Sequence, residues 1–116
     1  MDYSALAQEI TQLHAELCSA LADPRRILLL YALSEHPHNV SELAKKVEIS
    51  QPAASRHLKI LKQRGLVHAT RKGTSVEYTL TDERLIEALN LLRSVLYDRL
   101  TYRANLIEVA TTSSER

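Results

Sequence analysis

The sequence predicts a mainly α-helical fold with a small β-hairpin. Apolar residues recur every three or four positions over residues 3–21 and again over 82–108, which is the spacing of helices that bury one face. Between residues 66 and 80 this spacing gives way to two short β-prone runs, which indicate a pair of strands. A chain of 116 residues is long enough for one domain but hardly for two.

Two helices are expected in the N-terminal part. The first spans residues 3–21, and its apolar stripe consists of Leu6, Ile10, Leu13, Leu17 and Leu21. Asp23 then caps a second helix with Pro24 in its first turn, where the missing N–H is no loss. This helix extends to about Ser34 and is apolar nearly all round, so we expect it to be the buried centre of the domain. Residues 36–39 follow as a loop.

A short helix, a tight turn and a longer helix come next. The short helix spans residues 41–47 with Ser41 as its cap, and residues 48–49 form the turn. Ser50 caps the longer helix, and Gly65 ends it, as a glycine just past a helix end usually does. This succession is the helix-turn-helix plan.

The helix that begins at Ser50 has two chemically different sides. Ala54, Leu58 and Leu61 form an apolar side that can bind to a core. The opposite side is polar and cationic and consists of Gln51, Ser55, Arg56, Lys59 and Lys62. A helix with a small, uncharged polar N-terminal turn and a basic flank fits the major groove of double-stranded DNA. The sequence therefore predicts a DNA-binding protein.

The two β-prone runs, residues 66–71 and 76–80, are joined by residues 72–75 as a hairpin turn. A basic hairpin directly after a DNA-reading helix is a wing (about 66–80), whose tip can reach an adjacent backbone or minor groove. With a last helix after it, the element order is ααααββα, which makes the predicted fold a winged helix-turn-helix.

Asp82 is expected to cap the last helix, which continues to about Glu108. Its apolar stripe consists of Leu85, Leu89, Leu92, Leu96 and Leu100. The helices over 3–21 and 82–108 carry more apolar surface than one small core needs, so they predict a homodimer formed by the first and last helices. The single domain then spans residues 1–108, and residues 109–116 form a flexible tail.

Composition and charge agree with a globular protein of the cytoplasm. Charged residues make up 25% and hydrophobic residues 45% of the chain, and neither a membrane span nor a signal peptide is recognisable. The single cysteine, Cys18, excludes an intrachain disulfide framework and fits a reducing compartment. The net charge is only +1, but residues 41–80 hold eight basic and three acidic residues, which places the positive charge on the DNA-reading segment.

Several linked motifs resemble the ArsR/SmtB family of small winged-helix repressors. In chain order they are Ala20-Leu21-Ala22-Asp23-Pro24-Arg25-Arg26, Ser41-Glu42-Leu43-Ala44, Ser50-Gln51-Pro52-Ala53-Ala54-Ser55-Arg56-His57-Leu58, Gly65-Leu66-Val67 and Tyr78-Thr79-Leu80-Thr81-Asp82. The resemblance covers nearly the whole chain. It implies a homodimeric repressor that binds an inverted-repeat operator and is released by an effector.

Carried onto this sequence, the resemblance makes Gln51, Ser55 and Arg56 the candidates for reading bases. Glutamine pairs with adenine and arginine with guanine in the major groove, while serine tolerates either. The candidates for phosphate contacts are Lys59, Lys62, Arg71, Lys72 and Thr74. His57 has two interpretations, a phosphate contact or a packing residue at the boundary between helix and core.

The resemblance implies two types of metal site, and this chain lacks ligands that each of them needs. For the site on the last helix, Asp82 matches the first ligand and Asp98 stands at the position of the last. Arg84 and Val95 stand where histidines belong and cannot bind zinc. A second type needs a Cys-x-Cys pair after the Glu-Leu of the third helix, where residues 44–46 are Ala, Lys and Lys. We therefore predict neither metal nor cofactor.

Other signals stay open. Relatives with a two-cysteine switch have cysteines where this chain has Tyr31 and Tyr97. Cys18 is either a small buried filler or a single-cysteine redox switch. His36 and His38 share a loop and could hold a metal only if a partner added ligands; otherwise they are solvated. An unknown small-molecule effector, bound near some of the tyrosines, is a further alternative.

Two other classes of function are weighed against a DNA-binding regulator. A winged helix can be a protein-interaction module, but the DNA-reading face is basic rather than apolar. An enzyme is not expected, because the chain has no nucleophile–base pair, no workable metal cluster and only 2 glycines, too few for a phosphate-binding loop.

Overall fold

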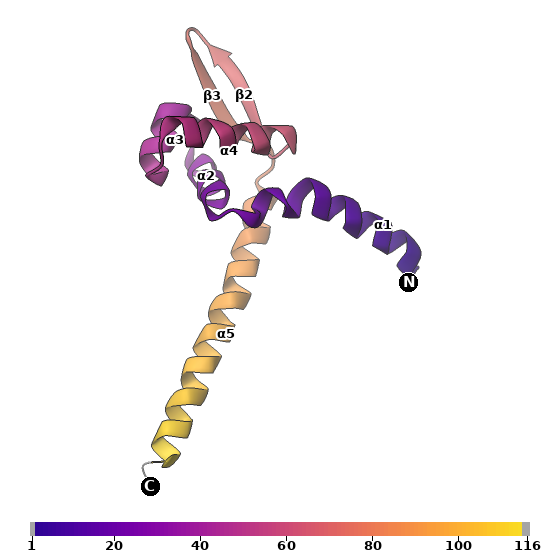
Figure 1. The fold of residues 1–116 in the computed structure, drawn as a ribbon, viewed down its shortest axis with the longest axis vertical. Helices are drawn as coiled ribbons and strands as arrows, with labels where there is room; N and C mark the ends of the chain where they lie inside the picture. Colours follow the sequence, from indigo (N-terminus) through magenta and orange to yellow (C-terminus); the bar gives the residue numbers. More distant parts are fainter. Residues whose placement is uncertain (1, 115–116) are drawn as a thin grey trace. The chain divides into compact units, whose positions relative to one another are not determined.

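The computed structural model describes residues 2–114, with side chains through Glu108. The chain divides into two compact units, Met1–Glu83 and Arg84–Arg116 (Figure 1). The elements of the first unit are, in chain order, α1 (Tyr3–Leu13), the π-helical turn η1 (His14–Cys18), the 3-10 turn η2 (Ala20–Ala22), α2 (Pro24–Glu35), β1 (His38–Asn39), α3 (Val40–Val47), α4 (Gln51–Gln63), β2 (Val67–Lys72) and β3 (Ser75–Leu80). The second unit is the helix α5 (Arg84–Ser114). The winged helix-turn-helix order predicted from the sequence is confirmed.

The first predicted helix is interrupted rather than continuous to residue 21. The Ser19 hydroxyl donates to the Ala15 carbonyl at 2.9 Å, and the Ser19 N–H bonds instead to the His14 carbonyl, five residues back, at 3.0 Å. A serine that occupies the carbonyl four residues back in this way disturbs the helical ladder, which explains the π-helical turn at this point. None of the residues of α1 and η1 is buried.

The core of the first unit lies between α2, α3, α4 and the start of β2. Its largest fully buried side chains are Leu29, Leu30, Leu43, Leu58, Leu61 and Val67. The second helix is thus central, as predicted, but it is not buried all round, because Leu28 is 51% exposed. Burial of a leucine side chain contributes about 1.5–3 kcal/mol, so this cluster supplies much of the stability of the unit.

Asn39, and not Ser41, caps α3. The Glu42 N–H donates to Asn39 Oδ1 at 2.8 Å, and the Asn39 N–H donates to Glu42 Oε1 at 3.0 Å, which completes a capping box. The prediction of a Ser41 cap was wrong because the helix begins at Val40, which places Ser41 inside it.

The sheet has three antiparallel strands in the order β1-β3-β2. The loop predicted over residues 36–39 is therefore partly a strand, since His38 pairs with Tyr78 and becomes buried. The hairpin turn is shorter than the predicted 72–75, because Lys72 pairs with Ser75 and only Gly73 and Thr74 lie between the strands. Gly73 has φ +62°, which a glycine adopts without strain and which the first position of such a two-residue turn requires.

The second unit differs from its prediction at both ends. α5 begins at Arg84, two residues beyond Asp82, which is one residue later than an Asp82 cap predicts. The helix continues past Glu108 to Ser114, and the last two residues of the predicted tail, 115–116, lie outside the described residues. No helix within residues 2–114 is both long and apolar enough to cross a membrane.

Candidate nucleic-acid interface

The turn between α3 and α4 is held by backbone hydrogen bonds. The Glu48 N–H bonds to the Lys45 carbonyl at 3.3 Å and the Ile49 N–H to the Ala44 carbonyl at 3.0 Å, with Glu48 in the left-handed conformation at φ 62°. This is a Schellman ending, which normally takes glycine at the left-handed position. It fixes the direction in which the chain enters α4.

Both ends of α4 are defined by the residues that the sequence singled out. Ser50 Oγ accepts from the Ala53 N–H at 3.2 Å, as a cap does. At the other end the Gly65 N–H bonds to the Lys62 carbonyl at 3.0 Å, and the Leu66 N–H to the Leu61 carbonyl at 2.9 Å. The helix therefore has a fixed length and a fixed rotation about its axis.

The two sides of α4 separate as predicted. The buried side consists of Ala53, Ala54, His57, Leu58 and Leu61. The exposed side contains all five of the predicted contact residues that were assigned to it, namely Gln51, Ser55, Arg56, Lys59 and Lys62. Because the apolar side is anchored in the core, these polar side chains are presented together to solvent.

His57 belongs to the buried side, with 9% of its surface exposed. Its Nδ1 lies 3.3 Å from the Arg26 Nη1 of α2. Burial lowers the pKa of His57 below its usual value, and the nearby arginines act in the same direction, whereas Asp23 opposes them. The structure thus favours the packing interpretation of His57 over a phosphate contact.

The hairpin of β2 and β3 projects beyond the α3–α4 pair (Figure 1). Arg71, Lys72 and Thr74, at or next to its tip, are all exposed. Lys72 forms an ion pair with Glu77 across the hairpin at 3.0 Å. A surface pair of this kind is worth about 0–1 kcal/mol, so a phosphate can compete for Lys72, whereas Arg71 has no ion-pair partner among the described residues.

Arg26 is a residue that the sequence reasoning did not single out. It appeared only as the end of the Asp-Pro-Arg-Arg motif, and its contact with His57 joins positions 31 residues apart, which no local pattern reveals. Asp23 is better anticipated: its side chain accepts from the Arg25 N–H at 2.9 Å and caps α2, as predicted.

The candidate sensor residues are dispersed. Cys18 is exposed at the end of η1, so in this chain it is not a buried filler. The rings of His36 and His38 stack with centroids 4.0 Å apart, but His38 is buried in β1 rather than solvated, because its strand pairs with β3. Within the described part of the chain, no three His, Cys, Asp or Glu side chains lie close enough together to hold a metal ion.

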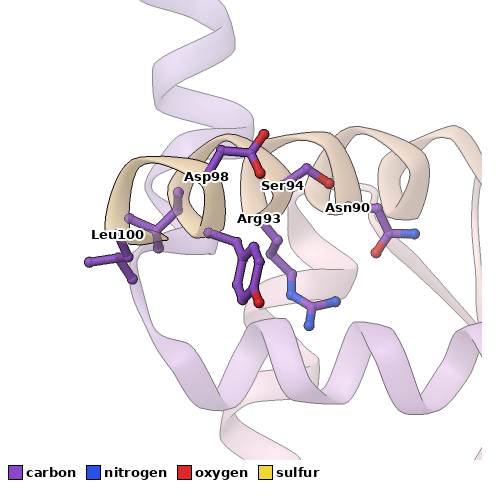
Figure 2. Close-up of a pocket in the computed structure, with 7 residues that line it drawn as sticks. Asn90, Arg93, Ser94, Asp98 and Leu100 are labelled. Atoms are coloured by element: carbon purple, nitrogen blue, oxygen red, sulfur yellow. The ribbon is translucent and has the colours of Figure 1, made fainter. Parts of the chain in front are cut away.

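A hollow runs along α5 (Figure 2). Its lining consists of Asn90, Arg93, Ser94, Leu96, Tyr97, Asp98 and Leu100. All of these residues belong to one helix and all are exposed, so the hollow has no opposing wall that would select an organic ligand.

Comparison with known proteins places these features in context. The family described as "Bacterial regulatory protein, arsR family" matches residues 23–69, which contain α2, α3, α4 and the start of β2. The transcriptional repressor SmtB of Mycobacterium tuberculosis is 42% identical over 78 residues, which are 67% of this chain and 58% of that protein. The nodulation protein NolR of Rhizobium meliloti is 32% identical over 90 residues, which are 78% of this chain and 74% of that protein.

A solved structure shows the same fold. The homodimeric winged helix-turn-helix DNA-binding domain Mb0332 of Mycobacterium bovis superposes with a TM-score of 0.71 at 28% identity, over 88% of this chain and 92% of that one. The chain spans just under three fifths of the length of the SmtB repressors it matches, at 58% and 59%.

Proposed function

Because the chain belongs to the ArsR family of bacterial regulatory proteins, we propose that it is a cytoplasmic, homodimeric transcriptional repressor that binds an inverted-repeat operator. The observation that carries the proposal is α4, a capped helix whose apolar side is buried and whose exposed side presents Gln51, Ser55, Arg56, Lys59 and Lys62. The basic hairpin beside it supplies a second contact to the same DNA.

The division of labour follows from the chemistry of each side chain. Gln51, Ser55 and Arg56 read base edges in the major groove, where Arg56 selects guanine and Gln51 selects adenine. Lys59, Lys62, Arg71, Lys72 and Thr74 contact phosphates, which adds affinity and orientation without sequence choice. His57 acts from the buried side of the helix rather than on the DNA.

The exposed apolar surface supports the dimer. α1 has no buried residue, and it exposes Tyr3, Ile10 and Leu13 by half or more. α5 exposes a longer series, which comprises Leu91, Leu92, Val95, Leu96, Tyr97, Leu100, Tyr102, Leu106 and Ile107. Patches of this kind mark association surfaces, and the similar Mb0332 domain is homodimeric. A two-fold dimer requires two half-sites about 10 base pairs apart, or a multiple of that spacing.

The decisive experiment is a fluorescence-anisotropy titration of the whole protein against the duplex upstream of its own gene. A scrambled duplex of equal length and composition is the control, and both are measured at 50 and 200 mM salt. Tight binding to the upstream duplex alone, weakened by salt, supports the proposal. Equal affinity for both duplexes, or affinity that salt does not change, would count against it.

The signal is tested in the same assay. Zinc, arsenite and a thiol oxidant are added in turn to the preformed complex. We propose that zinc and arsenite leave it intact, because the ligands of the family's metal sites are missing. Release by the oxidant that disappears in Cys18→Ser would identify the exposed cysteine as the sensor. Release by none of the three would direct the search to an organic effector.

A further inference from the structure

Arg26 connects the end of the first helical segment to the recognition helix. Its Nε donates to the Ala20 carbonyl at 2.6 Å, and its Nη2 donates to the Ser19 carbonyl at 3.3 Å. Its Nη1 faces the Nδ1 of His57, at 3.3 Å. Ala20 is 1% exposed and His57 is 9% exposed, whereas Arg26 itself is half-buried, so the link lies at the edge of the core. One guanidinium thus bridges two segments through three different nitrogens.

The chemistry of this bridge fixes the protonation of His57. A guanidinium has only donors, so Nδ1 must accept with its lone pair, which requires a neutral ring with its proton on Nε2. A proton added to Nδ1 would set two donors and two positive charges against each other at hydrogen-bond distance. The bridge and the charged form of His57 are therefore incompatible.

Most of the charges around the His57 ring also favour its neutral form. On the α2 side they are Arg25 and Arg26, which lower the pKa of His57, and Asp23, which raises it. Arg56 of α4 itself also lowers it. α3 and β2 pack against α4 as well, but none of their described residues is among the charges that shift this pKa.

We infer that Arg26 is a positioning residue for DNA binding: it holds α4 in place against the Ser19–Ala20 backbone, and it does so only while His57 is neutral. The inference rests on the proposed function, because it concerns how the recognition helix is held. It also connects the segment that leaves α1, through Arg26 of α2, to the proposed base-reading helix. A change at the end of α1 therefore has a physical path to α4.

The first test uses the DNA-free protein, so that it does not depend on operator binding. Imidazole ¹⁵N NMR of the whole chain follows each histidine between pH 8 and 5. The expected result is a neutral His57 protonated on Nε2, with a pKa that rises in Arg26→Gln. Arg25→Gln is not a neutral control here, because Arg25 also acts on the ring, so Arg103→Gln is the matched control. A ring protonated on Nδ1, or a pKa that Arg26→Gln leaves unchanged, would overturn the inference.

The second test measures affinity for the operator duplex across the same pH range. Wild-type affinity is expected to be constant near pH 8 and to fall about threefold to tenfold once the pH lies below the lowered pKa of His57, because one hydrogen bond is then replaced by repulsion. His57→Gln should lose the pH-dependent fall, because its amide oxygen can accept from Arg26 at every pH in this range. His68→Gln, at an exposed position on β2, should retain the fall.

Arg26→Gln should bind more weakly at pH 8 and show a flat profile. Arg26→Lys should resemble it, because the donors of an ammonium all sit on one nitrogen, whereas the bridge uses three separate nitrogens of the guanidinium. Wild-type affinity in both Arg26 variants, or an unchanged pH profile in His57→Gln, would overturn the inference. If the wild type binds no duplex at any pH, the proposed function fails, and the NMR titration alone decides whether the bridge exists.

Discussion

Asn39 and Glu42 cap each other at the start of α3, with nitrogen–oxygen distances of 2.8 and 3.0 Å. The pair fixes where the helix-turn-helix begins. Asn39→Ala should lower the free energy of unfolding by about 1 kcal/mol, because it leaves the Glu42 N–H without its cap. Urea denaturation measures the change. Ser41→Ala is the matched control, and a larger loss for Ser41 than for Asn39 would contradict the assignment.

Glu48 occupies a left-handed conformation that suits glycine better. Glu48→Gly should raise the free energy of unfolding by about 0.5–1 kcal/mol, since it relieves this strain at the turn. The control replaces a glycine at another position with positive φ. Gly65 has φ 75°, and an added Cβ would meet no atom within 4 Å. Gly65→Ala should therefore lose about 1 kcal/mol through the backbone alone. A loss of stability in Glu48→Gly would contradict the argument.

The roles proposed for Arg56 and Lys62, base reading and phosphate contact, can be told apart by experiment. Arg56→Ala should weaken operator binding by about 1–3 kcal/mol and relax discrimination at one base pair. Lys62→Ala should weaken binding to all duplexes about equally and lower the slope of log affinity against log salt by about 1. Titration against single-base variants of the operator, at several salt concentrations, distinguishes the two. Unchanged discrimination in Arg56→Ala would remove Arg56 from the base-reading set.

The lowered pKa of Asp23 predicts that the stability of the protein depends on pH. The hydrogen bond from the Arg25 side chain, followed by that from the Arg25 N–H, lowers the pKa of Asp23 to about 2 from 3.8. Because the folded state holds the carboxylate more strongly, its contribution is complete above pH 3.8 and is lost as the pH falls towards 2. In urea unfolding between pH 5 and 2, Asp23→Asn should lose less stability than the wild type. An identical pH profile in the wild type and in Asp23→Asn would show that the Asp23–Arg25 pair does not contribute to stability.

Leu96 tests the proposed dimer surface. It is 57% exposed on α5, so in a monomer Leu96→Asp would change little. In a dimer that covers this position, the carboxylate would be buried without a partner, and dimerisation should weaken by at least about 2 kcal/mol. Sedimentation equilibrium measures the dissociation constant. Thr101→Asp, at an exposed position outside the predicted stripe, should leave it nearly unchanged.

The parts of the fold that the sequence predicted well depend on local signals. Ser50 and Gly65 mark the ends of α4 by their own chemistry, and the spacing of Ala54, Leu58 and Leu61 identifies its buried side. The hairpin was recognisable for the same reason, because its strands are joined by a turn with a glycine at the position that needs one.

The sequence-based predictions failed where residues far apart in the chain determine the local structure. β1 has two residues and exists because β3, almost forty positions later, pairs with it. Asn39 and Ser41 are both cap-forming residue types, so only the position of the helix start distinguishes them. The candidate site shows the same limit: the exposed set on α4 follows from helical spacing, whereas the burial of His57 against Arg26 depends on how α2 packs.

The strand β1 joins directly to α3, and Asn39 takes part in both elements. It pairs with Glu77 of the hairpin, and its side chain caps α3. No linker therefore separates β1 from α3, and we expect the wing and the helix-turn-helix to move together. In the proposed complex with DNA, the protein would then set the distance between the contacts of α4 and those of the wing, and a half-site with a different spacing would be bound less well.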